Sequence, residues 1–143
     1  DALPILPQLD HDAVARLARD GAVAIRGALT AAEVTMLTRG IESNLAVPGP
    51  LAAVASDADD PGRFFEDFCN WQRIPEYESI LRHSALPAIA VALMQSASAR
   101  IYHDHLLVKE AGTRQSTPWL QDQPYYSVDG RQNVSFGISV DPV

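Results

Sequence analysis

Apolar residues recur at helical spacing in three parts of the first hundred residues. Val14 and Leu17 follow Asp10, which can cap a helix that ends at Gly21. A second helix is predicted after Thr30, because a glutamate three positions later completes a capping box. The alanine-rich run over 84–96, with a proline near its first turn, predicts a third helix. These segments predict a helical layer.

Other parts of the chain have the pattern of strands. Residues 22–29 are partly β-branched and short, which favours a buried strand. Between 99 and 110 polar and apolar residues alternate, so that His103 and His105 share one face of a strand. Two more strands are predicted, around residues 118–126 and over 133–140.

The order of these elements predicts one domain. Helices are expected before the strands, and neither a repeat nor a linker divides residues 1–143. The aromatic run over 63–77 is expected to anchor a loop or short helix on the core, and the acidic run over 55–62 to form a solvated loop. The pattern therefore predicts an α+β protein with helices packed on an antiparallel sheet.

Composition narrows the choice of partners and compartment. The net charge of −7 disfavours nucleic acids and acidic membranes, because both would be repelled. Cys69 is the single cysteine, so an internal disulfide is impossible. Without an apolar run long enough to span a membrane or a basic leader, a cytoplasmic location is expected.

Few residues point to chemistry on spacing alone. The pair His103 and His105 could chelate a divalent metal if a third ligand converged, or could simply make structural hydrogen bonds. Cys69 follows a phenylalanine and is interpreted as a core thiol. The glycines match neither a dinucleotide fingerprint nor a phosphate loop.

Four segments in order carry a family resemblance. They read FFEDFCNWQRIPEY, YHDHLLVKEAGT, TPWLQDQPYYSVDG and NVSFGISVDPV. Together they resemble the phytanoyl-CoA dioxygenase family of iron(II)- and 2-oxoglutarate-dependent oxygenases, from about His11 to Val143. The resemblance implies a double-stranded β-helix, or jelly roll, whose mouth binds iron through two histidines and one acid beside the keto acid.

The sequence departs from that family at the site. Asp122 matches the carboxylate of the His-x-Asp motif, but Leu120 stands where the first histidine belongs. Gly137 stands where the family commonly has a tryptophan near the 2-oxoglutarate pocket. The second histidine and the arginine for 2-oxoglutarate are expected beyond Val143. The resemblance therefore implies an incomplete barrel, weak or absent binding of iron(II) and 2-oxoglutarate, and no independent activity.

Three functions stay open. The chain could be a remnant without turnover, an active hydroxylase completed by another chain or by missing residues, or a small-ligand scaffold with an aromatic wall. A half-barrel edge also predicts self-association or a complementing chain. A substitute metal set of His103, His105 and Asp122 is a further alternative. The residues expected around a pocket are His103, His105, Lys109, Trp119, Gln123 and Tyr125.

Overall fold

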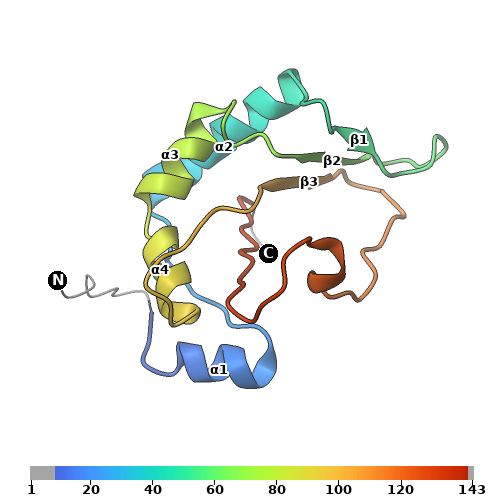
Figure 1. The fold of residues 1–143 in the computed structure, drawn as a ribbon. Helices are drawn as coiled ribbons and strands as arrows, with labels where there is room; N and C mark the ends of the chain where they lie inside the picture. The colour runs from blue at the N-terminus through green and yellow to red at the C-terminus, as the bar shows by residue number, and fades with distance from the viewer. Residues whose placement is uncertain (1–8, 142–143) are drawn as a thin grey trace.

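The computed structural model describes residues 9–141 and shows an α+β fold (Figure 1). The α+β prediction is confirmed, although β1 and β2 precede the last two helices instead of following them. The helices are α1 (Ala13–Asp20), α2 (Ala31–Ala46), α3 (Pro75–His83) and α4 (Leu86–Leu93). The strands are β1 (Ala53–Val54), β2 (Phe64–Phe68) and β3 (His105–Lys109), and η1 (Gln123–Tyr125) is a short 3₁₀-helix.

The predicted end of α1 and the predicted start of α2 are confirmed, but α1 begins at Ala13 with Asp12, not Asp10, as its N-cap. Helix α1 ends at Gly21, whose φ of 77° is the left-handed conformation that glycine adopts without strain. Helix α2 begins at the predicted capping box, in which Thr30 Oγ1 accepts from the Glu33 backbone N–H at 3.2 Å. The Thr30 backbone N–H donates in return to Glu33 Oε2 at 2.7 Å.

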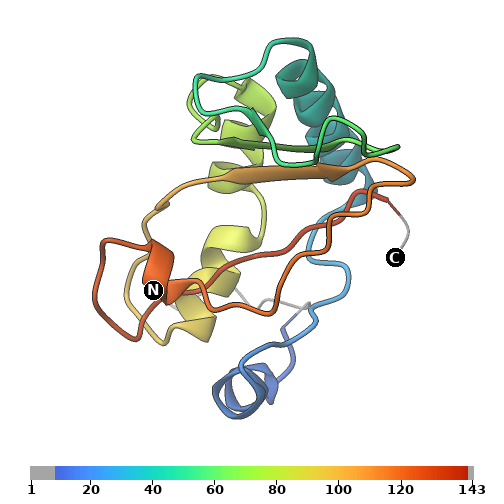
Figure 2. The same cartoon turned by 90° about the vertical axis from the view of Figure 1, so that its right-hand side faces the viewer.

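Strand β2 is the centre of a three-stranded antiparallel sheet in the order β1-β2-β3. Its register with β3 places Phe68 opposite His105 and Phe64 opposite Lys109. Helices α2 and α3 lie on one side of the sheet, and the C-terminal segment runs along the other (Figures 1 and 2). We call the side away from these helices the open face; it carries Phe64, Glu66, Phe68, His105, Leu107 and Lys109.

Several predicted elements differ from the structure. Residues 64–68 form a strand instead of a loop or short helix, and helix α3 was not predicted at all. The expected strand over 99–110 begins only at His105. Within residues 9–141, the predicted strands over 22–29, 118–126 and 133–140 are not formed; the second contains η1, and the other two are irregular. Residues 142 and 143, the end of the last motif, lie outside the described part.

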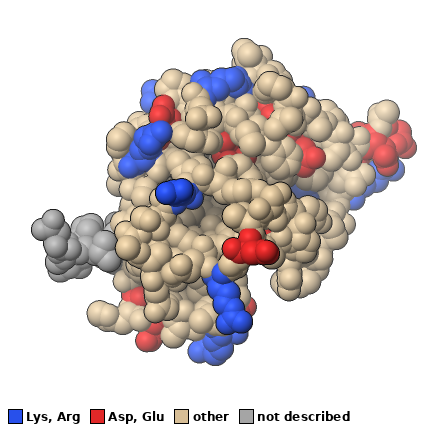
Figure 3. Space-filling view, viewed as in Figure 1, with Lys and Arg blue, Asp and Glu red and all other residues tan. Residues whose placement is uncertain are grey.

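The described residues bury apolar side chains in two places. Phe65 on β2 and Ile74, Tyr77 and Ile80 at α3 are buried, and Tyr77 lies against Gly40 of α2. Between α1 and α4, Ala13, Ile89 and Leu93 form a second core, on which Val134 of the C-terminal segment packs. Phe68 and Trp71 are only half-buried. Acidic and basic side chains are scattered over the face of the molecule drawn in Figure 3. None of the helices in residues 9–141 has the length and apolar content needed to cross a membrane.

Candidate functional site

A buried carboxylate ties the sheet to helix α2. Asp67 on β2 and Asn44 on α2 are both 0% exposed. Asp67 Oδ2 accepts from Asn44 Nδ2 and from the Gly49 backbone N–H, each at 2.7 Å. Its Oδ1 accepts from the Phe68 backbone N–H at 2.8 Å. These donors fix the connection after α2 against the central strand.

Asn70 completes this buried polar cluster. Its Nδ2 donates to the Phe68 carbonyl at 3.0 Å, and its Oδ1 accepts from the guanidinium of Arg73 at 2.8 Å. Position 49 must be glycine, because an added Cβ would clash with Asn70 Oδ1. Burial raises the pKa of Asp67, but hydrogen bonds from Gly49, Asn70, Asn44 and Phe68 outweigh burial and hold the pKa below its usual value.

Asp104 organises the turn that follows β2. Its Oδ1 accepts from the Trp71 backbone N–H at 2.9 Å, and its Oδ2 from that of Asn70 at 3.1 Å. The Asp104 carbonyl accepts from the backbone N–H of Cys69, a residue with a φ of 60°. Cys69 is exposed, so the prediction of a core thiol is wrong. The acid between the two histidines therefore has a structural role.

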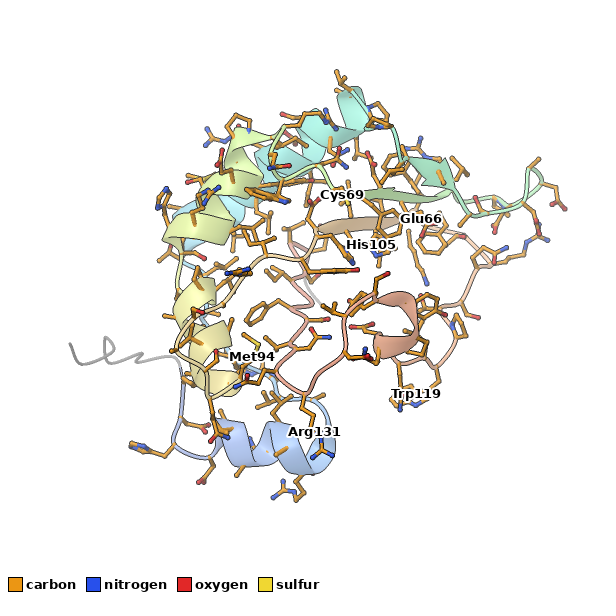
Figure 4. All side chains as sticks on the ribbon, in the orientation of Figure 1. Glu66, Cys69, Met94, His105, Trp119 and Arg131 are labelled. Carbon is orange, nitrogen blue, oxygen red and sulfur yellow. The ribbon has the colours of Figure 1, made fainter. Side chains whose placement is uncertain are left out.

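His105 packs on the open face. Its ring stacks on Phe68 with the centroids 3.8 Å apart and the planes 20° from parallel. Its Nε2 lies 3.6 Å from Glu66 Oε2, and Figure 4 shows both side chains on the side of β3 that faces the C-terminal segment. Burial lowers the pKa of His105, and the nearby Glu66 carboxylate only partly offsets this effect.

His103 belongs to an aromatic cluster beside this stack. It lies before β3, with its ring centroid 5.2 Å from Tyr102 and 5.5 Å from Tyr126. The rings of His103 and Phe68 form a T-shaped pair, with their centroids 6.2 Å apart. Tyr102 and Tyr126 also contact each other, at 5.1 Å. This cluster joins the residues before β3 to the segment after η1.

Asp122 is held by the last part of the chain. Ser135 Oγ donates to Asp122 Oδ2 at 2.6 Å, and Tyr126 Oη lies 3.4 Å from the same serine hydroxyl. Asp122 and Ser135 are exposed. Asp122, the predicted counterpart of the family's carboxylate ligand, therefore contacts a hydroxyl of the C-terminal segment.

The other predicted site residues are spread over the surface. Leu120 is 46% exposed, and Trp119 is fully exposed and lies outside η1 in Figure 4. Gln123 Nε2 donates to the Val128 carbonyl at 2.6 Å. Tyr125 is 72% exposed. Trp119 and Tyr125, two of the residues expected around a pocket, are therefore largely exposed in the described structure.

Two further predicted positions lie at the edges of this region. Lys109 Nζ donates to Thr117 Oγ1 at 2.7 Å and sits 4.8 Å from the centroid of the Phe64 ring. A Cβ at Gly137 would meet nothing within 4 Å, so the backbone leaves room for the larger side chain common in the family.

A hollow of about 290 Å³ lies beside α1, away from the predicted site residues. It is lined by Asp10, Ala13, Arg16, Ala24, Ile25 and Arg26.

The described residues do not fit a three-ligand metal centre. Across residues 9–141, no three histidine, cysteine, aspartate or glutamate side chains converge closely enough to hold an ion. The substitute set of His103, His105 and Asp122 is therefore not assembled. Leu120 offers only hydrocarbon beside Asp122, and a hydrocarbon has no lone pair for a metal.

Sequence reasoning missed the buried polar residues of the described structure. Asp67, Asn44 and Asn70 were not singled out, although Asp67 stands at a position of FFEDF that shares its side of the strand with Phe65. An acid in phase with a buried phenylalanine is a usable signal of a hydrogen-bonded buried carboxylate. Ser135 had no such signal, because its contact with Asp122 depends on how two irregular segments meet.

Comparison with known proteins identifies one family. The model of the family described as Phytanoyl-CoA dioxygenase (PhyH) matches residues 17–143, which is most of the chain. Searches among curated proteins and among solved structures returned no significant match.

Proposed function

Because the chain belongs to the phytanoyl-CoA dioxygenase family, we propose that it is an oxygenase-type domain that does not turn over 2-oxoglutarate on its own and serves as a binding or structural module. The family implies a jelly roll, iron(II) and 2-oxoglutarate. The residue that carries the proposal is Leu120, which stands in the place of the first histidine ligand. Asp122 is then the one recognisable family ligand in this motif.

The contacts around Asp122 support this proposal. One carboxylate oxygen accepts a 2.6 Å hydrogen bond from Ser135. His105 on β3 and His103, which precedes β3, each pack against an aromatic ring. A single exposed carboxylate binds a divalent ion weakly, because water must supply the remaining ligands. The aromatic cluster of Tyr102, His103 and Tyr126 gives the module a surface suited to a small apolar or aromatic ligand.

Restoring the histidine tests the proposal. Leu120→His adds an imidazole two positions from Asp122, so isothermal titration with cobalt(II), and with iron(II) under anaerobic conditions, should show affinity at least about tenfold higher than that of the unaltered chain. Leu120→His combined with Asp122→Ala should lose this gain. Val54→His, which adds a histidine at an exposed position on β1, controls for adventitious binding.

A succinate assay completes the test. Neither the unaltered chain nor the Leu120→His variant should release succinate from 2-oxoglutarate above the background of the Val54→His control. Tight iron binding with succinate release by the unaltered chain would overturn the proposal. A Leu120→His variant that binds no better than the control would show that Asp122 and position 120 do not face a common site.

A further inference from the structure

The segment after η1 has the sequence of a strand but none of its pairing. In residues 133–140, NVSFGISV, apolar side chains occupy the even positions, and polar or small ones occupy the odd positions. Among the described residues, 127–141 make no backbone-to-backbone hydrogen bond. Phe136 and Ile138 are 37% and 40% exposed. This segment therefore presents unpaired backbone and apolar surface together.

Its side-chain contacts position the segment without using its backbone. Gln132 Nε2 donates to the Met94 carbonyl at 3.1 Å, Val134 packs on the core between α1 and α4, and Ser135 bonds Asp122. Figure 2 shows the segment extended along the side of the molecule away from α2 and α3. An extended, tethered segment with free backbone groups is a template for another strand.

The opposite charges at the two ends of the segment favour a second copy of the same segment as its partner. No charged residue occurs in 132–140, but Arg131 precedes this stretch and Asp141 follows it. Neither side chain takes part in an ion pair within residues 9–141. An antiparallel copy centred on Phe136 would place each arginine opposite the aspartate of the other copy. The sequence is thus complementary to itself in this register.

Two alternative registers are less favourable. A shift by one residue places Phe136 opposite a small residue on the polar face, so the apolar sides no longer coincide. A shift that centres the pair on Ser135 places Asp141 opposite Asp129 of the second copy, and like charges directly opposite are destabilising.

We propose that residues 131–141 pair with the same residues of a second copy as antiparallel strands related by a two-fold axis at Phe136. Val134, Phe136 and Ile138 then form one apolar stripe across the interface, and two pairs of Arg131 with Asp141 close its ends. This interface does not depend on whether Asp122 binds a metal. It is an isologous contact, so assembly stops at the dimer.

Charge exchange tests the register. In sedimentation equilibrium the unaltered chain should dimerise, and Arg131→Asp or Asp141→Arg should each weaken the dimer at least tenfold, because each creates two like-charge contacts. The double variant Arg131→Asp with Asp141→Arg should restore most of the affinity. Arg26→Asp, an exposed change of equal charge elsewhere, should leave dimerisation unchanged.

Cross-linking tests the axis independently. In a Cys69→Ser background, Phe136→Cys should form a disulfide-linked dimer on mild oxidation, since only this side chain faces itself across the axis. Ile138→Cys, which faces Val134 of the second copy, should cross-link far less. A chain that stays monomeric at all concentrations overturns the proposal, as does a dimer that is insensitive to both charge variants and does not cross-link at position 136.

Discussion

Two regions of the molecule use acids in opposite ways. Around Asp67, a fully buried carboxylate receives several donors from β2, α2 and the connection between them. Around Asp122, an exposed carboxylate receives a single side-chain hydroxyl from an irregular segment. The first arrangement fixes the fold, whereas the second tethers a surface segment. Burial and the number of donors, not the residue type, decide which role an acid takes.

The largest expected difference is in stability. Asp67→Ala leaves the buried amide of Asn44 and the partly buried backbone N–H groups of Gly49 and Phe68 without their acceptor, which should cost about 3 kcal/mol. Asp122→Ala should cost less than about 1 kcal/mol, because its oxygens are exposed to water. Urea unfolding of both variants measures the contrast. Equal losses would mean that Asp122 is as structural as Asp67.

A smaller change in the free energy of unfolding should appear when the pH is lowered. Burial lowers the pKa of His105 in the folded protein, so the unfolded chain binds a proton more readily than the folded chain does. The stability that this histidine contributes is present above its unfolded pKa, near 6.5, and is lost as pH falls below that value. The urea midpoint of unfolding should therefore decrease as the pH is lowered from 7.5 to 5.5.

Substitution separates His105 from the other titrating groups. His105→Gln should flatten the decrease between pH 7.5 and 5.5, while His83→Gln, at an exposed position on α3, should leave it unchanged. The lowered pKa of Asp67 also makes the folded protein less stable as pH falls. This loss begins only below the pKa of an unfolded aspartate, near 3.9, and so lies outside the range from pH 7.5 to 5.5. A stability that rises as pH falls from 7.5 to 5.5 would contradict the assignment for His105.

The same contrast explains what the sequence predicted. The capping box at Thr30 and the glycine after α1 are local signals, and both are confirmed. Helix α3 was not predicted; Pro75 stands in its first turn, where the missing N–H of proline costs nothing. A signal made by residues close together in the sequence was enough to predict a helix end.

Predictions that depend on distant partners were less successful. The alternation over 133–140 is real, but a strand also needs a neighbour, and the described residues supply none. In the same way, His103 and His105 share a strand pattern, yet His103 lies before β3 and packs on Tyr126 while His105 stacks on Phe68. Alternation predicts which face a side chain takes; it does not predict what covers that face.

Amide hydrogen exchange resolved by residue tests the contrast most directly. The account predicts slow exchange for the backbone N–H groups of Gly49, Phe68 and Asn70, whose acceptors are the carboxylates of Asp67 and Asp104. Residues 133–140 should exchange fast at low protein concentration and become protected as the dimer forms. Equal protection of both regions in the dilute monomer would contradict the account, because it would require backbone partners for 133–140 within a single chain.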